Sequence, residues 1–138
     1  MLASEVAEWI GTNVTSCSFD TTGVSGNVFI STLPSSPDTV VMVSEYNGIV
    51  DDKNPFSDIN VQTRIRGTKD PRVGYNIAKE IFDELQGLTN TTLISSGKHV
   101  VKVNALNTPI DIGRDDNGRH EWTVNFQIEV RDVGTNRS

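Results

Sequence analysis

With 138 residues, a formal net charge of −6 and a pI of about 4.8, the chain has the size of one domain. Its acidic balance argues against a general nucleic-acid binder, which needs a basic face, and its single cysteine, Cys17, excludes a disulfide framework or a paired-thiolate metal site. No run of about 18 apolar residues could span a membrane. The acidic N-terminal stretch does not resemble a signal peptide, so we expect a cytoplasm-like compartment.

The first half of the chain predicts one short helix followed by three strands. Apolar residues at helical spacing predict a helix over residues 2–11, and the polar residues 12–25 predict a loop. The three strands are predicted over residues 27–33, 39–46 and 59–66. The second strand is nearly continuous in apolar residues, which predicts burial on both faces. Asn47-Gly48 is expected to end it, and residues 49–57 are expected to form an exposed loop.

The segment VQTRIRG, residues 61–67, covers most of the third predicted strand and the glycine that follows it. Successive side chains of a strand point to opposite faces, so Gln62, Arg64 and Arg66 are expected on one face and the residues between them on the other. The placement of two arginines and a glutamine on one strand face is unexpected in an acidic protein and points to a specific role.

A longer amphipathic helix is predicted over residues 71–85, where apolar side chains recur at helical spacing. Asp70 is a candidate N-cap, Pro71 suits the first helical position, and Gly87 is a candidate C-terminal stop. Residues 88–98 are mixed in character and predict no regular element.

The last third of the chain predicts two strands, residues 99–105 and 121–131. In the second of these, five apolar residues alternate with polar ones without a break, which indicates one buried face. Between the strands, Ile110 and Ile112 alternate before a turn at residues 116–118.

The expected order is therefore α-β-β-β-α-β-β, without regular βαβ alternation. This order predicts an α+β fold in one domain, residues 1–138. We expect a single mixed, mostly antiparallel sheet with the main amphipathic helix packed on it and a short N-terminal helix.

Chemical motifs are scarce. The run at residues 115–118 resembles part of a calcium loop, but the register that places Gly118 at its sixth position puts Gly113 and Val124 where carboxylates are needed. The two histidines have no partner at metal-ligand spacing, and no phosphate-binding or nucleophile motif is present. No catalytic, metal-binding or cofactor-binding residue is assigned, so we expect a protein that is not an enzyme and uses no cofactor.

The remaining candidate functional residues are those expected at the protein surface. Arginine is favoured at interfaces because its planar fork pairs with carboxylates in fixed geometry. The candidate interface residues are Gln62, Arg64, Arg66, Arg114 and Arg119, with the acidic Asp51 and Asp52. The alternative is that these are ordinary strand residues that face solvent and form charge pairs within the sheet.

Several segments in a fixed order resemble the tail-terminator (tail completion) proteins of long-tailed bacteriophages, which are often labelled minor capsid proteins. The segments are VQTRIRG (61–67), YxIAxxIxxxL (75–85), PIDIGRDDxGR (109–119) and NF (125–126). The resemblance extends over about residues 39–130, and its specificity lies in the order of the segments because no single motif is diagnostic.

The resemblance implies a virion protein at the head–tail junction that catalyses no reaction. Such a protein closes the tail tube as a ring, typically a homo-hexamer, and presents a surface to the head-side connector. Its partners would be further copies of itself, the tail-tube protein and the connector. DNA would pass through the ring without specific binding, and no membrane is involved.

On this reading, Arg64, Arg66, Arg114 and Arg119 make subunit-to-subunit or ring-to-tube contacts by pairing with acidic residues of a neighbour. The loop that carries Asp51 and Asp52 is a candidate partner surface. Changing Arg64 and Arg66 to glutamate is expected to leave a folded monomer and to impair assembly.

Three other readings stay open. One is a different virion component: a head-completion, connector or capsid-decorating protein, or a tail-tube subunit with residues 47–58 as its long loop. Another is a small hydrolase that uses a carboxylate or His99. The third is an adaptor module that pairs through an exposed edge strand.

Overall fold

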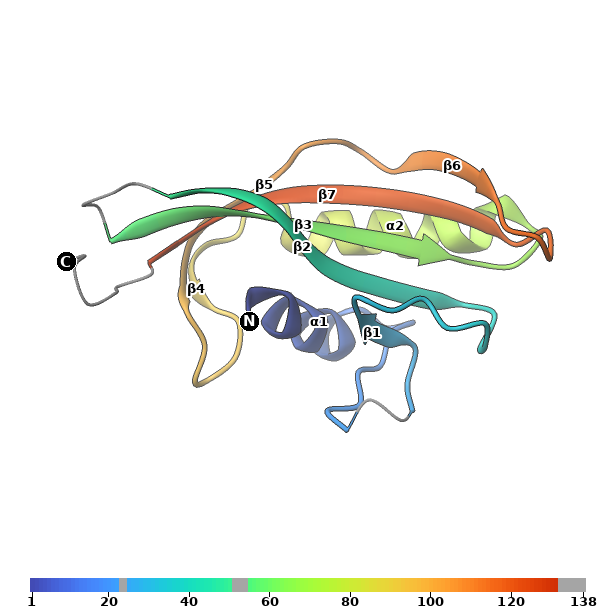
Figure 1. Cartoon of the computed structure of the whole chain (residues 1–138), viewed down its shortest axis with the longest axis horizontal. Helices are drawn as coiled ribbons and strands as arrows, with labels where there is room; N and C mark the ends of the chain where they lie inside the picture. The colour runs from blue at the N-terminus through green and yellow to red at the C-terminus, as the bar shows by residue number, and fades with distance from the viewer. Residues whose placement is uncertain (23–24, 51–54, 132–138) are drawn as a thin grey trace.

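The computed structural model describes residues 1–22, 25–50 and 55–131, in which one sheet is covered by two helices (Figure 1). The elements are α1 (Leu2–Asn13), β1 (Val28–Ile30), β2 (Val40–Val50), β3 (Phe56–Arg66), α2 (Pro71–Leu85), β4 (Thr89–Thr92), β5 (His99–Ala105), β6 (Ile110–Arg114) and β7 (His120–Arg131). The strand order is β1-β2-β3-β7-β5-β4, with β6 also paired to β7. All the pairings are antiparallel except β1–β2, which confirms the α+β fold with one mixed, mostly antiparallel sheet.

The helix α2 begins and ends where its residues predict. The Asp70 side chain accepts a hydrogen bond from the backbone N–H of Arg72, and Pro71 occupies the first turn. After the helix, Gly87 has a φ of +85°, a conformation that glycine adopts without strain. The helix α1 runs two residues further than predicted, to Asn13.

The two central strands are longer than predicted. Instead of ending β2, Asn47-Gly48 forms a β-bulge within it, and pairing with β3 resumes at Gly48. A side chain at Gly48 would lie 2.7 Å from the carbonyl oxygen of Asp58, so the close approach of the two strands requires glycine here. The expected loop over residues 49–57 is therefore wrong at both ends, and its middle, residues 51–54, lies outside the described residues.

Two shorter strands also differ from prediction. The first strand is only three residues long and pairs parallel to β2. The sequence did not predict β4, whose four residues are all Thr or Asn and lie at the sheet edge against β5. Polar residues without an apolar face give no strand periodicity, so only pairing with β5 defines this element.

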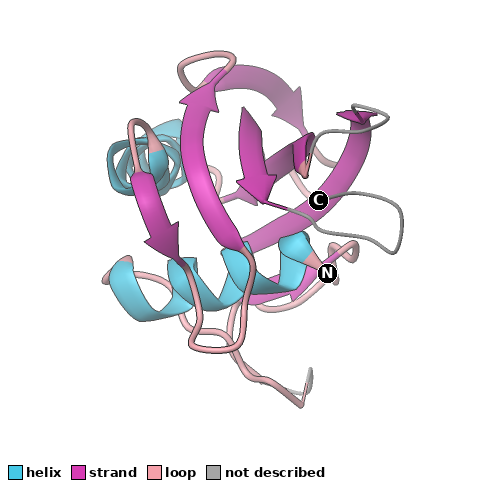
Figure 2. Ribbon diagram, turned by 90° about the vertical axis from the view of Figure 1, so that its left-hand side faces the viewer, coloured by secondary structure: helices cyan, strands magenta, loops and turns pink. Residues whose placement is uncertain are grey.

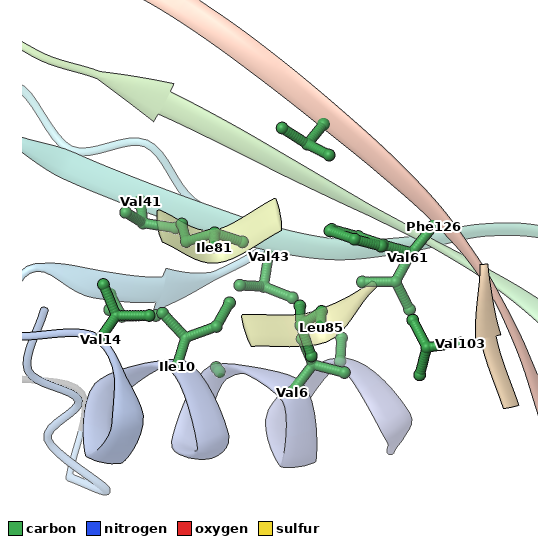
Figure 3. Close-up of a cluster of buried hydrophobic side chains, with 14 of the residues drawn as sticks. Val6, Ile10, Val14, Val41, Val43, Val61, Ile81, Leu85, Val103 and Phe126 are labelled. Atoms are coloured by element: carbon green, nitrogen blue, oxygen red, sulfur yellow. The ribbon is translucent and has the colours of Figure 1, made fainter. Parts of the chain in front are cut away.

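One hydrophobic core lies between the sheet and the two helices (Figure 3). The helices contribute residues such as Val6, Ile10 and Leu85, and the strands contribute residues such as Val61 and Phe126, all less than 2% exposed. Burying a side chain of this size contributes roughly 1.5–3 kcal/mol. This common core places both helices on the same face of the sheet, which Figure 2 shows as strongly curled.

The other face carries neither helix. The expected burial of β2 on both faces is therefore wrong, because Met42 and Ser44 point away from the helices and are only half-buried. The predicted alternation along β3 is confirmed, since Val61, Thr63 and Ile65 are buried on the helix side. The sheet thus has one apolar face and one polar face.

Candidate functional site

The polar face, here called the open face, is built from three strands that stand in register. Its side chains form three rows across β2, β3 and β7: Met42–Arg64–Thr123, Ser44–Gln62–Asn125 and Tyr46–Asn60–Gln127. Gln62 donates a hydrogen bond to the Thr123 hydroxyl at 3.4 Å, and Asn125 donates to Asn107 at 3.1 Å. Tyr46 is 40% exposed at the end of its row. The face is thus a surface of amides and hydroxyls with a few apolar side chains along β2.

Arg64 is the charged residue in the first row, and it pairs within the sheet. Its Nε and Nη2 lie 3.0 and 3.2 Å from the two carboxylate oxygens of Glu121. The Glu121 side chain is 7% exposed, whereas that of Arg64 is 40% exposed. This bidentate pair is an intra-sheet charge pair, the alternative that the sequence left open, and it leaves part of the guanidinium at the surface.

Arg66 is buried, with 3% of its surface exposed. Its Nε donates to the carbonyl of Asp38 at 3.0 Å and its Nη2 donates to the carbonyl of Pro37 at 2.7 Å. Burial, and then the neighbouring Arg119, lower the pKa of Arg66, while nearby carboxylates oppose that shift. Arg66 therefore holds the segment between β1 and β2 against the end of the sheet.

Arg119 holds the same segment from the β6–β7 turn. Its Nη1 donates to the carbonyl of Ser35 at 2.6 Å and lies 3.2 Å from Asp38 Oδ1, and its Nε donates to Asp115 at 2.8 Å. Burial by itself would lower the pKa of Arg119, but its bonds to Asp115 and Asp38 raise it. The segment between β1 and β2 and the β6–β7 turn therefore meet at one end of the sheet.

A hollow of about 670 Å³ lies at this end of the molecule. It is lined by Ser35, Asp38, Thr68, Lys69, Asp70, Asn117 and Arg119. Its lining includes two cations, Lys69 and Arg119, and two carboxylates, Asp38 and Asp70. Such a lining suits contact with a polar, charged surface of another protein.

The structure thus brings together only some of the residues that the sequence singled out. Arg66 and Arg119 both bond the segment that contains Asp38, and Arg64 pairs with Glu121, whose charge also acts on Arg66, so the three arginines share one charge network. Gln62 lies beside this network on the open face. Arg114 is exposed and stands apart, opposite His120 in the β6–β7 ladder. Asp51 and Asp52 lie outside the described residues.

The burial of Arg66 changes the expected effect of replacing both arginines of β3. A glutamate at position 66 would be a buried carboxylate facing two carbonyl oxygens, which destabilises the fold. The doubly reversed variant is therefore not expected to be a folded monomer. Arg64 is the residue of this pair that reports on a surface role.

Sequence reasoning missed two acidic members of the network, Asp38 and Glu121. Glu121 could have been found, because it shares the strand face of Thr123 and stands opposite Arg66. Asp38 could not, because it belongs to a segment without periodicity whose position depends on the folded chain.

The other candidate groups are structural. His120 Nε2 lies 2.6 Å from Asp111, and burial raises the pKa of the Cys17 thiol to about 12. The turn at residues 115–118 is closed by Asp115, which accepts backbone hydrogen bonds from Asn117 and Arg119. In the part of the chain that the structure describes, no three His, Cys, Asp or Glu side chains are grouped to hold a metal ion. Neither described helix has the length and hydropathy needed to cross a membrane.

Comparison with known families gives one match. A family model described as "Bacteriophage tail terminator protein" matches residues 12–132. The match includes all the strands and the helix α2. No curated protein matches the chain.

Proposed function

Because the chain belongs to the bacteriophage tail terminator family, and is thus a structural tail protein of a phage virion, we propose that it caps the tail tube as a ring and joins the tail to the head-side connector. The family is a structural family and not an enzyme family. The proposed partners are further copies of the chain, the tail-tube protein and the connector.

The observation that carries the proposal is the open face, together with the arginine-bonded segment at one end of it. A sheet face of nine polar and apolar side chains in register, covered by neither helix, offers an uncovered area for protein contact. At one end of it, the buried Arg66 and Arg119 fix the segment between β1 and β2 in place. A preorganised surface loses less conformational entropy on binding than a flexible surface does.

The interface residues expected from the sequence take two roles in this proposal. Gln62, Arg64 and Arg114 are accessible and contact a partner, as do Asp51 and Asp52 between β2 and β3. Arg66 and Arg119 act indirectly, by holding the segment around Asp38. The net charge of −6 is consistent with a channel that lets DNA pass without binding it.

In vitro joining tests the proposal. Tails and heads purified from a phage that lacks this protein are mixed with the purified chain, and infectious particles are counted. We expect the wild-type chain to restore joining and Arg114→Glu to reduce it by at least tenfold. Lys79→Glu is the matched control, because Lys79 is an exposed cation on α2, away from the open face.

The copy number separates this function from its nearest rival. A terminator is present as one ring per particle, whereas a tail-tube subunit is present in many copies along the tail. Quantitative mass spectrometry of purified particles measures this ratio against the tube protein. Copies in proportion to tail length would contradict termination.

A further inference from the structure

Three strands of the sheet, β1, β4 and β6, have an outer edge that pairs with no strand among the described residues. One edge is β1. At the opposite side, the chain runs along β7 from Leu106, whose N–H donates to the carbonyl of Asn125 at 2.7 Å, to the end of β6 at Arg114. In Figure 1, β6 lies at the top of the sheet and β1 at the bottom. Unpaired edges are templates for pairing with another chain.

The outer edge along residues 106–114 exposes three aliphatic side chains beside two charged ones, Arg114 and an Asp111 that lies 2.6 Å from His120. Leu106, Ile110 and Ile112 are 54%, 45% and 42% exposed, and we call them the apolar edge. Exposed aliphatic side chains along the unpaired outer edge of a sheet mark an interaction site. The exposed Arg114 follows directly.

The edge at β1 is concave, whereas the apolar edge carries projecting aliphatic side chains. A hollow of about 260 Å³ there is lined by Phe19, Val28, Phe29 and Ile30, and we call it the β1 hollow. Asp20 and the hydroxyls of Thr21, Thr22 and Thr32 complete its lining. The volume is below the roughly 300–1,000 Å³ of small-molecule sites. A hollow of this size suits one or two aliphatic side chains of another protein.

We propose that the apolar edge of one copy of this chain packs into the β1 hollow of the next copy. The two surfaces are complementary in shape, because one projects aliphatic side chains and the other is concave and aromatic. Their charges can also pair: Arg114 lies beside the first surface, where Asp111 is held by His120, and Asp20 lies beside the second. A second copy supplies both surfaces at once, which favours it over an unrelated partner.

The position of the two surfaces sets the type of assembly. They lie at opposite sides of the same sheet, so the contact is head-to-tail. A pair of copies therefore keeps one unused surface at each of its two ends, where a further copy can bind. Such heterologous contacts close into a ring when the rotation between copies permits. The inference rests on the proposed function, since it names the surfaces that build the ring. Because Ile110 stands opposite Thr123, the contact occupies the β6 margin of the open face and leaves its side chains on β2 and β3 free for the tube or the connector.

Site-directed cross-linking in assembled particles tests this contact. Ile112→Cys and Thr32→Cys place exposed thiols on the apolar edge and beside the β1 hollow. The native Cys17 is buried and its pKa is raised to about 12, so it does not react. Particles complemented with the doubly substituted chain are treated with a bismaleimide and separated on a denaturing gel.

We expect a ladder of cross-linked species that ends at the ring size. Co-expression of the two singly substituted chains should give only cross-linked dimers. The matched control replaces Ile112→Cys with Glu84→Cys, an exposed position on α2, and should give no ladder. The same variants are checked for folding by circular dichroism.

Two results overturn the inference and leave the proposed function standing. One is the absence of cross-links in particles that hold a normal number of copies. The other is cross-linking of Ile112→Cys to itself, which requires a two-fold contact. Particles that contain no copies at all would overturn both the inference and the proposed function.

Discussion

The Arg64–Glu121 pair gives the sharpest test of the network at the end of the open face. Replacing Arg64 with alanine removes two hydrogen bonds to a carboxylate that is 7% exposed. The remaining cation near that carboxylate is Arg66, whose own donors are bonded to backbone carbonyls. We therefore expect Arg64→Ala to destabilise the fold and not only to alter its surface.

The magnitude follows from the unequal exposure of the two side chains. A hydrogen bond to a charged group contributes about 1.5–3 kcal/mol, and an exposed ion pair contributes about 0–1 kcal/mol. Arg64 is 40% exposed and Glu121 is 7% exposed, so the expected loss lies between these, at about 1–2 kcal/mol. With an unfolding entropy of about 0.29 kcal/mol/K for a chain of this length, Tm falls by about 3–7 °C.

Urea denaturation of Arg64→Ala, Glu121→Ala and the double variant measures the coupling between the two side chains, which we expect at about 1 kcal/mol. The matched control is Arg72→Ala. Arg72 makes the same two-bonded contact with Asp70, but its side chain is 83% exposed, so its loss should hardly move the unfolding midpoint. Equal, small changes in the unfolding midpoint for Arg64→Ala and Arg72→Ala would refute the view that charge pairing stabilises this end of the open face.

Three further outcomes are expected. Phe126→Ala, in the centre of the core with 0% exposure, should lower the free energy of unfolding by about 3–5 kcal/mol in urea denaturation. Cys17 should resist thiol reagents at pH 8 and react once urea unfolds the chain, because burial raises its pKa to about 12. The melting temperature Tm should stay nearly constant from pH 7 to about pH 5 and fall below about pH 4. The reason is that the bonds from Arg119, against the effect of burial, lower the pKa of Asp115, so its contribution is present above the usual aspartate pKa and lost as the carboxylate is protonated; a flat profile to pH 3 would contradict this.

The elements that the sequence predicted well are those with a strong apolar period. The helix over residues 71–85 and the last strand have one buried face each, and that face repeats at 3.6 or 2 residues. The elements that it predicted poorly depend on contacts between distant residues. The bulge at Gly48 interrupts the period of β2, and β4 has no apolar face, so pairing with neighbours alone defines both.

The candidate site shows the same limit at the level of side chains. Alternation along β3 correctly placed Gln62, Arg64 and Arg66 on one face. It could not show that the segment around Asp38 folds over that face and buries Arg66, because the segment carries no periodicity. Which arginines are surface residues and which are structural is decided by that tertiary contact.

Electron microscopy of particles made with and without this protein tests termination most directly. The account predicts tails of abnormal length that are not attached to heads when the protein is absent, and normal particles when the wild-type chain is supplied. Tails of normal length beside defective or empty heads would contradict termination and assign the protein to the head.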